Sequence, residues 1–431
     1  MKSLNYWKKA IKIIPGGNGL LSKRPNRFLP EGWPTYYLKA KGISIWDLNS
    51  KKYIDFSTMG VGSAILGYAN SKIDSSVVKY LRKGVNTTLN CPEEYFLARE
   101  LLKYDRFAQQ VKFARGGGEA MSLAIRIVRA SSKNTKIAFA GYHGWHDWYL
   151  AANLKKKTNL NNHLLKNLIP IGIPKGLKNT IIPFKFNNSD QIEDICKKNK
   201  LSAIIIEGAR NEYPTKEFVK KINYLKKKYK LCLVIDEITS GWREQNGGVY
   251  KKVGLKPDLV IYGKALGNGY AISAVVGKRK YMNNSQETFI SSTAWTERIG
   301  FISALSTIKF FTKHKVGKII NKNGKYIQDG WRAIAKKNNL LITTNKFLPM
   351  PSFSFNYGKL NEKLHTFFTE LMLKRNYLAT NSMSVTFAHT RKEIDKYIKK
   401  CDEVFQIISN DIKNKKINLK SKVRVLIYQK I

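Results

Sequence analysis

Short, continuous runs of apolar residues alternate with helical patterns through the middle of the chain. The clearest of these runs lie at 111–114, 136–140, 203–206, 231–235 and 259–262. Because they form continuous apolar runs between helical segments, we expect each to be a strand that is buried on both faces. Strands of this kind form parallel sheets that helices cover on both sides. The sequence therefore predicts an α/β fold with a mostly parallel central sheet.

Both ends of the chain show a different pattern. Residues 36–56 have the alternation and turns of an antiparallel strand hairpin. Long helical patterns follow from about residue 300, with short apolar segments at 351–355 and 384–387 between them. This pattern predicts a smaller α+β domain built from both chain ends. The expected divisions are 1–60 for the N-terminal segment of the small domain, 61–310 for the large domain and 311–431 for the C-terminal small domain.

The net charge of +47 is the unusual feature of the composition. Nucleic-acid readers rely on arginine forks and clustered basic patches. Here the excess is almost entirely lysine and is spread over the whole sequence. A solvated lysine-rich surface is therefore favoured over a nucleic-acid partner.

Membrane and secretory segments are not expected either. No stretch approaches the ~18 consecutive apolar residues that a spanning helix needs, and the basic N-terminus lacks the uninterrupted apolar core of a signal peptide. The four cysteines are far apart and form no CxxC pair: Cys91, Cys196, Cys232 and Cys401. A zinc site, redox motif or disulfide framework is thus not predicted, and a cytoplasmic location fits best.

Two charged residues follow neighbouring apolar runs. Asp236 ends one predicted strand, and Lys264 comes just after the next one. Open α/β sheets bind their ligands at the carboxyl ends of their strands. Lys264 is therefore a candidate for a desolvated Schiff-base amine, and Asp236 could hold a protonated pyridine nitrogen. The alternative is an aspartate that caps a turn and a lysine that extends to water.

Two further motifs also follow predicted strands. Gly116, Gly117 and Gly118 lie between a strand and a helix, where backbone N–H groups and the helix dipole can hold a phosphate. No Gly-Lys-Ser/Thr follows, so this is not a Walker motif, and a flexible turn is the alternative. Tyr142 follows another strand, and its ring could stack on a planar ligand. The neighbouring histidines could suggest a metal, but the aromatic surroundings favour a packed loop, and no metal site is predicted.

Together these motifs resemble the class III pyridoxal-phosphate-dependent aminotransferases, and within them the glutamate-1-semialdehyde 2,1-aminomutase group. The similarity extends from Ile14-Pro15-Gly16-Gly17 through the glycine cradle, Asp236-Glu237 and Lys264 to Ala388-His389-Thr390, which is nearly the whole chain. The resemblance implies a PLP-dependent transferase of fold type I, with pyridoxal 5'-phosphate as cofactor.

The resemblance also implies roles for individual residues. Lys264 would form the internal aldimine and carry protons, while Asp236 would keep the pyridine nitrogen protonated. Tyr142 would stack on the ring, and Glu207 would lie near it. The cradle glycines would hold the phosphate, chiefly through the backbone of Gly117 and Gly118. Thr293 would reach the phosphate of a neighbouring subunit, so a homodimer is expected.

The sequence departs from the family pattern at the cradle and around the substrate. The family usually carries serine and threonine hydroxyls in the cradle, whereas this chain has three glycines, so backbone amides alone would hold the phosphate. Departures elsewhere place three cations near the expected substrate path: Arg24, Arg210 and Arg298. Each is a candidate ligand for a substrate carboxylate or phosphate, and surface ion pairing is the alternative reading.

Three functions follow from this pattern. The first is a two-substrate transaminase that moves an amino group from a small-molecule donor to the carbonyl of a keto acid or keto sugar by way of pyridoxamine phosphate. The second is a glutamate-1-semialdehyde 2,1-aminomutase that makes 5-aminolevulinate. The third is a basic binding protein whose fold has lost its enzymatic activity. We disfavour it because a buried charge pair without a ligand lowers the stability of the fold.

Overall fold

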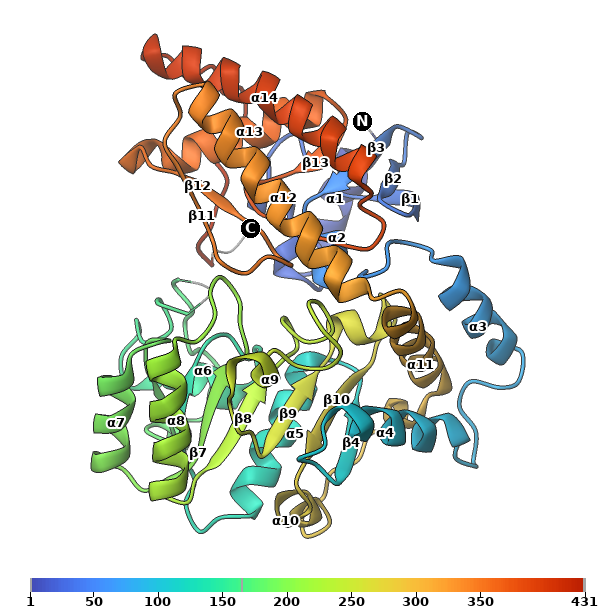
Figure 1. Cartoon of the computed structure of the whole chain (residues 1–431), viewed down its shortest axis with the longest axis vertical. Coiled ribbons are helices and arrows are strands. Elements are labelled where there is room, and N and C mark those ends of the chain that lie inside the picture. The colour runs from blue at the N-terminus through green and yellow to red at the C-terminus, as the bar shows by residue number, and fades with distance from the viewer. Residues whose placement is uncertain (1, 164–165, 429–431) are drawn as a thin grey trace. The chain divides into compact units, whose positions relative to one another are not determined.

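Seven strands form the central sheet of the larger of two compact units in a computed structural model of the chain (Figure 1). The structure describes residues 2–163 and 166–428. The larger unit comprises Ser71–Gly317, and the smaller unit combines residues 1–70 with 318–431. The domain boundaries expected from the sequence stay a prediction.

The sheet of the larger unit has the strand order β4-β10-β9-β8-β7-β5-β6. Only β10 runs antiparallel to its neighbours β4 and β9, so the sheet is mostly parallel, as predicted. Its strands are β4 (Gln110–Ala114), β5 (Lys136–Ala140), β6 (Ile181–Pro183), β7 (Leu201–Glu207), β8 (Cys232–Asp236), β9 (Leu259–Tyr262) and β10 (Ser273–Gly277).

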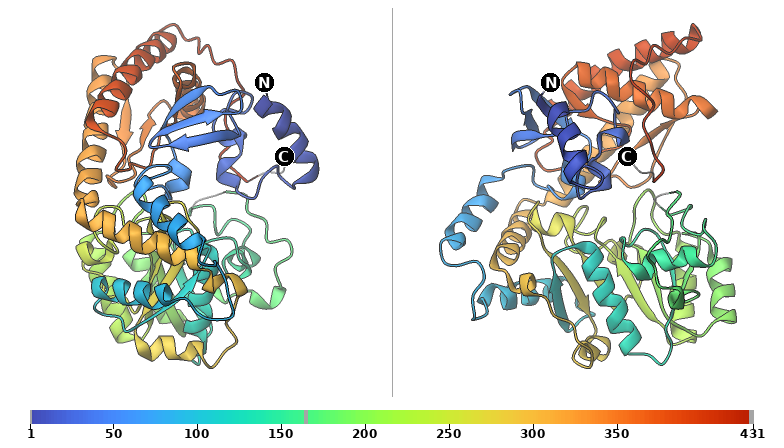
Figure 2. Two further views of the ribbon diagram at one scale, coloured as in Figure 1. Left: turned by 90° about the vertical axis from the view of Figure 1, so that its right-hand side faces the viewer. Right: turned by 180° about the vertical axis from the view of Figure 1, so that it is seen from behind.

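The helices of the larger unit alternate with these strands along the chain. They are α3 (Ser71–Leu81), α4 (Pro92–Tyr104), α5 (Gly117–Ala130), α6 (Asp147–Leu150), α7 (Ser189–Lys198), α8 (Lys216–Lys228), α9 (Tyr250–Val253), α10 (Arg279–Met282) and α11 (Arg298–Lys313). Helix α5 packs across the sheet against β9 and β10 (Figure 2). Its apolar face and the inward side chains of β5, β7, β8 and β9 form one buried core. This core holds the beginning of α5 in a fixed place relative to the strand ends.

The smaller unit is an α+β structure. A four-stranded sheet has the order β1-β2-β3-β13, in which β13 is parallel to β3. Its strands are β1 (Tyr37–Lys41), β2 (Ser44–Asp47), β3 (Lys52–Phe56) and β13 (Tyr377–Ala379), and a separate pair is formed by β11 (Ile342–Thr344) and β12 (Phe353–Phe355). The helices are α1 (Lys2–Ile13), α2 (Met59–Gly62), α12 (Val316–Lys337), α13 (Asn361–Lys374) and α14 (Arg391–Lys413).

The structure differs from the sequence-based expectation in several segments, including the short strands β6, β11 and β13, which were not predicted. The predicted apolar segment 384–387 is not a strand, because its backbone N–H groups bond singly to Ser57, Pro349 and Ile65 instead of to one neighbouring strand. Strand β10 was not predicted, because Ser273–Gly277 is short and lies in a glycine-rich stretch. Within the described part of the chain, every helix is too short or too polar to cross a bilayer.

Candidate functional site

Four functional side chains lie at the carboxyl ends of neighbouring parallel strands. Glu207 and Asp236 are the last residues of β7 and β8 and face each other in the strand register. Lys264 comes two residues after β9, and Tyr142 comes two residues after β5. Because these four strands are parallel, their carboxyl ends meet at one edge of the sheet. The structure therefore brings these four predicted residues together at one sheet edge.

Ile238 connects this row of strand ends to the glycine cradle. A Cβ atom built on Gly117 would lie 3.0 Å from Ile238 Cδ1, and one built on Gly263 would lie 3.4 Å from Ile238 Cγ2. The turn that follows Asp236 therefore packs directly against both the start of α5 and the residue before Lys264. The cradle, the acid and the lysine consequently surround one small region.

Lys264 has an unusual backbone conformation and is half-buried. Its φ of 45° is left-handed, a conformation that costs a residue with a side chain about 1–2 kcal/mol. The preceding residue, Gly263, is extended. Nζ of Lys264 donates a hydrogen bond of 3.0 Å to Oγ1 of Thr239. Strained backbone of this kind persists where the surrounding structure holds it, as is common at functional sites.

The amine of Lys264 titrates far from its ordinary range. Burial, reinforced by the guanidiniums of Arg210 and Arg243, lowers the pKa of Lys264 to about 7, although the carboxylates of Asp236 and Glu207 act in the opposite direction. A lysine with this pKa is uncharged in about half of the molecules at pH 7. A neutral amine is the form that attacks carbonyl carbons and accepts protons.

A buried histidine holds Asp236. Oδ2 of Asp236 lies 2.8 Å from Nδ1 of His143, and Oδ1 accepts a hydrogen bond of 2.9 Å from the backbone N–H of Ile238. Nε2 of His143 lies 3.2 Å from the carbonyl oxygen of Ala140. These two contacts fix the imidazole, and the imidazole in turn orients the carboxylate of Asp236.

Glu207 and Arg210 form an ion pair at the site. Nε of Arg210 donates to Oε1 and Oε2 of Glu207 at 2.8 and 3.0 Å, and Nη2 contacts Oγ1 of Thr239 at 3.3 Å. The backbone N–H of Tyr142 donates to Oε2 of Glu207 at 3.3 Å. A Cβ atom at Gly141, where φ is +118°, would lie 2.6 Å from the same oxygen. Only glycine at position 141 therefore allows Glu207 to hold the backbone in front of Tyr142.

The cradle begins α5. Gly116 is the N-cap, and its N–H donates to Oε2 of Glu119 at 2.9 Å, as does the N–H of Arg115 at 3.0 Å. These two N–H groups are therefore already satisfied within the chain. The N–H groups of Gly117 and Gly118 belong to the first helical turn, where the helix itself offers no acceptor and the dipole favours an anion. An anion at this helix end would bind to Gly117 and Gly118, with Gly116 shaping the turn.

The remaining predicted residues make other contacts. Thr293 is exposed in the short turn Thr293–Thr296. Arg298 is paired with Glu93, with Nε–Oε2 at 2.9 Å and Nη2–Oε1 at 3.0 Å. Arg24 belongs to the smaller unit, where its guanidinium covers Gly16. Arg298 makes the contacts expected of a residue in a surface ion pair. The functional roles of all three residues stay predictions.

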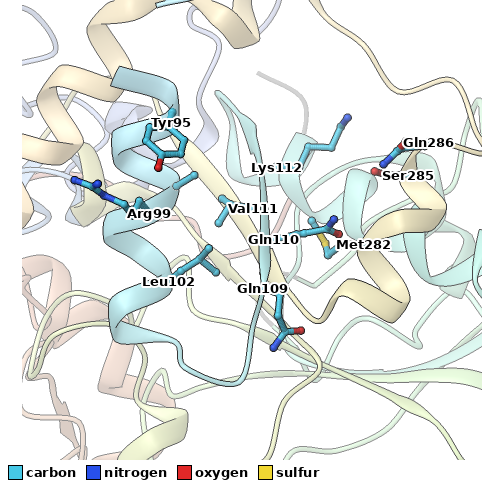
Figure 3. A pocket seen from close by; sticks show the side chains of 11 residues that line it. Tyr95, Arg99, Leu102, Gln109, Gln110, Val111, Lys112, Met282, Ser285 and Gln286 are labelled. Atoms are coloured by element: carbon cyan, nitrogen blue, oxygen red, sulfur yellow. The ribbon is translucent and has the colours of Figure 1, made fainter. Parts of the chain in front are cut away.

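A separate hollow of about 450 Å³ lies along the edge strand β4, between α4 and α10 (Figure 3). Arg99 of α4 and Lys112 of β4 are its charged lining residues. None of the site residues predicted from the sequence lines it, and we assign it no part in the chemistry.

Several residues of the site were not predicted as functional, and three of them show why. Thr239 follows Asp236 by three positions in the same strand-end turn, which is a local signal that sequence analysis could have used. His143 was considered only as a metal ligand, because its contact with Asp236 spans 93 positions. Arg115 binds the backbone of 294–297, again far along the chain.

Similarity to known proteins extends over most of the chain. Residues 31–344 match the family described as Aminotransferase class-III. A 3-aminobutyryl-CoA aminotransferase from Cloacimonas acidaminovorans (strain Evry) is 29% identical over 387 residues, covering 87% of this chain and 89% of the relative. A glutamate-1-semialdehyde 2,1-aminomutase from Wigglesworthia glossinidia brevipalpis is 31% identical over 433 residues, covering 94% and 97%.

Solved structures give the same fold. The PLP internal aldimine form of the FumI protein from Sphingopyxis sp. MTA144 superimposes with a TM-score of 0.87 at 21% identity and covers 98% of both chains. An omega-transaminase from Sphaerobacter thermophilus superimposes with a TM-score of 0.83 at 19% identity, covering 94% of this chain and 97% of its own. The fold is therefore that of the PLP-dependent transferases of fold type I, as the resemblance implied.

Proposed function

This chain belongs to the class III aminotransferases, and from that premise we propose which of its residues carry the reaction and what they act on. It is an enzyme that uses pyridoxal phosphate, with an amino donor and a keto acceptor as its substrates. We propose a two-substrate transaminase for a keto acid or keto sugar, with Lys264 and Asp236 as its catalytic residues. The observation that carries this proposal is the buried amine of Lys264 beside the oriented carboxylate of Asp236.

The residues present fit the cofactor. A phosphate matches the N–H groups of Gly117 and Gly118, where a side chain at either position would crowd the cradle. A protonated pyridine nitrogen matches the carboxylate of Asp236, and a carbonyl carbon matches the neutral amine of Lys264. The ring of Tyr142 supplies an apolar face at the neighbouring strand end. Ile238 contacts Gly117, Gly263 and Asp236, and so brings the cradle, the acid and the lysine together.

The chain's own residues divide the chemical work. When bound, pyridoxal phosphate supplies a protonated ring that accepts an electron pair from the carbon bearing the amino group. Asp236, held by His143, keeps a proton on the ring nitrogen. Nζ of Lys264 takes a proton from the substrate carbon that bears the amino group and returns it to the carbon on the other side of the amino nitrogen. It can do so because its lowered pKa lets both the neutral amine and the ammonium exist near neutral pH. The hydroxyl of Thr239 accepts a hydrogen bond from Nζ and orients it.

Arg210 is the candidate substrate ligand with the strongest geometric support. Both Arg210 and Arg298 are paired with a glutamate, but only Arg210 also shares the hydroxyl of Thr239 with Lys264. A guanidinium grips a carboxylate or phosphate with two parallel hydrogen bonds, which an ammonium reproduces poorly. We expect Arg210→Lys to raise the Michaelis constant of the anionic substrate. The absorption spectrum of the bound cofactor should stay unchanged.

An aminomutase is the alternative, and the 31% identity to the Wigglesworthia glutamate-1-semialdehyde 2,1-aminomutase favours it. The two functions differ in their need for a second substrate. Glutamate-1-semialdehyde should be converted to 5-aminolevulinate without added acceptor only if this alternative is right. Under the transaminase proposal, a donor such as glutamate should change the visible spectrum of the cofactor, and a keto acceptor should restore it.

Borohydride labelling tests the assignment of Lys264 itself. Reduction of the holoenzyme should attach the cofactor to the peptide that contains Lys264, as read by mass spectrometry. Lys264→Ala should lose this label and fall at least about 10²-fold in turnover, on the order of the loss of one acid–base group. The matched control is Lys220→Ala on the exposed face of α8, which should keep both. Label on another lysine in the native enzyme would contradict the assignment.

A further inference from the structure

The loop 144–146 sits unusually close to the first turn of α5. A Cβ atom at Gly144, where φ is +109°, would lie 3.1 Å from Cα of Gly118. A Cβ atom at Gly118 would lie 2.8 Å from Cε1 and 2.9 Å from Nδ1 of His146. The imidazole of His146 therefore occupies the space that any side chain at position 118 would need. The glycine at 118 and the histidine at 146 form one arrangement, although they are far apart in the sequence.

The imidazole presents a polar atom to the cradle that the rest of the chain does not use. Nδ1 of His146 is buried and has no hydrogen-bond partner among the described residues. Buried ring nitrogens usually have a hydrogen-bond partner. A nitrogen without one, next to the place where a ligand is expected, therefore indicates a contact with that ligand. The ring is stacked on Trp145, with centroids 4.4 Å apart, which holds its plane.

The charge and tautomer of His146 suit a donor. Burial lowers the pKa of His146 below its ordinary value, while the nearby carboxylates of Glu119 and Asp147 act in the opposite direction. The neutral ring carries one N–H, which can reside on Nδ1. Oε2 of the nearby Glu119 accepts hydrogen bonds from the N–H groups of Arg115 and Gly116, so this oxygen already has its partners.

We propose that Nδ1 of His146 donates a hydrogen bond to the phosphate of the cofactor. It would supply the side-chain donor that a cradle of three glycines lacks. This inference rests on the proposed function, which puts the phosphate at the start of α5. It replaces the expectation that backbone amides alone hold the phosphate.

A pair of matched variants separates donation from space filling. His146→Asn shortens the side chain but keeps an N–H donor close to the position of Nδ1. His146→Leu keeps the bulk and removes the donor. The dissociation constants of pyridoxal phosphate and of pyridoxal, which has no phosphate, are measured for each full-length protein by equilibrium dialysis. The ³¹P resonance of the bound phosphate is recorded alongside.

His146→Leu should weaken the binding of pyridoxal phosphate about tenfold or more, as expected for the loss of one hydrogen bond to a charged group. It should leave pyridoxal unchanged and shift the ³¹P resonance. His146→Asn should retain most of the affinity for pyridoxal phosphate. The unchanged binding of pyridoxal also shows that each variant is folded.

A reciprocal exchange tests the geometry. Gly118→Ser alone should crowd the imidazole, because its Cβ would lie 2.8 Å from Cε1 of the ring. Combined with His146→Ala, the serine has room, and its hydroxyl should restore the affinity for pyridoxal phosphate that His146→Ala loses. Failure of the double variant to regain affinity would count against an exchange of donors.

The remaining outcomes overturn different statements. If native protein prefers pyridoxal phosphate to pyridoxal but His146→Leu keeps that preference, the role of His146 is wrong and the placement of the phosphate stands. If His146→Leu weakens both ligands equally, His146 only fills space. If native protein shows no preference for the phosphate form, the placement of the phosphate in the proposed function is itself wrong.

Discussion

Lys264 owes its chemistry to its surroundings rather than to its position in the sequence. Burial is the largest cause of its lowered pKa, and two guanidiniums reinforce it. Arg210 has the larger effect of the two, and it is held in place by Glu207. At the residue scale, the ion pair of Arg210 and Glu207 thus lies next to the amine of Lys264 and also influences its pKa.

We expect Arg210→Leu to raise the pKa of Lys264. Removing the guanidinium removes a cation that disfavours the ammonium, and the freed carboxylate of Glu207 favours it further. In cofactor-free protein, the rate at which Lys264 is acetylated should rise with pH through a midpoint at about 7. This midpoint, followed by mass spectrometry of the Lys264 peptide, should move to higher pH in the variant. An unmoved midpoint would mean that Arg210 has no part in lowering the pKa of Lys264.

Asp236→Asn should separate catalysis from cofactor binding. The amide cannot keep a proton on the ring nitrogen, so turnover should fall about 10²-fold or more. The cofactor content should fall little, because the glycine cradle is intact. Both are measured on the same preparation, with absorbance for the content and a coupled assay for turnover. Equal and mild losses would indicate that Asp236 only caps its turn.

At the scale of elements, Arg115 joins the start of α5 to the segment 294–297. Its guanidinium donates to the carbonyl oxygens of Ala294 at 2.5 Å and Trp295 at 3.1 Å, and also to that of Glu297. The guanidinium carbon lies 4.9 Å from the ring centroid of Phe301. Thr293, the expected ligand of a neighbouring subunit's phosphate, immediately precedes this segment. The cradle and the predicted intersubunit contact are therefore fixed by one side chain.

Arg115→Ala should loosen this segment selectively. Several carbonyl groups lose their donor, each at about 1–3 kcal/mol where the group is buried. Hydrogen exchange should accelerate in 293–299 while β5 stays protected. Arg126→Ala is the matched control, because Arg126 lies on α5 and also donates to a backbone carbonyl, that of Phe289 at 2.8 Å. Similar exchange in both variants would contradict the special role of Arg115.

At the scale of the whole molecule, we propose a homodimer in which Thr293 completes the site of the other subunit. Thr293 is exposed within its own chain, as a residue that contacts a partner must be. Obligate sites of this kind require two copies, each giving the same residue to the other. The sequence implied this arrangement through the family resemblance, and it stays a prediction.

Mixing two inactive variants tests the dimer. In a heterodimer of Lys264→Ala and Thr293→Ala subunits, one site has both Lys264 and a partner's native Thr293. Refolding the two variants together should therefore restore affinity for the cofactor and activity to one of the two sites in each heterodimer. A chain that carries both substitutions, mixed with either single variant, is the control and should restore less. Sedimentation at low concentration should show a dimer throughout.

Local patterns were sufficient to predict much of this protein. The apolar runs predicted β5 and β9 with their observed bounds and β4, β7 and β8 to within about two residues. They also placed Lys264, Asp236 and the glycines at strand ends. This succeeded because a buried parallel strand must be apolar on both faces, and because parallel strands bring their ends together.

Contacts between distant segments could only be decided by the tertiary structure. Nothing in the spacing of His143 and Asp236, of Arg115 and 294–297, or of Gly118 and His146 indicates that they touch. Each pair depends on how loops from different strands pack over one edge of the sheet, which periodicity does not encode. The sequence by itself determined the fold and the residues that can do the chemistry. Packing decided which side chains hold them, how far the pKa of Lys264 falls, and which N–H groups are left for an anion.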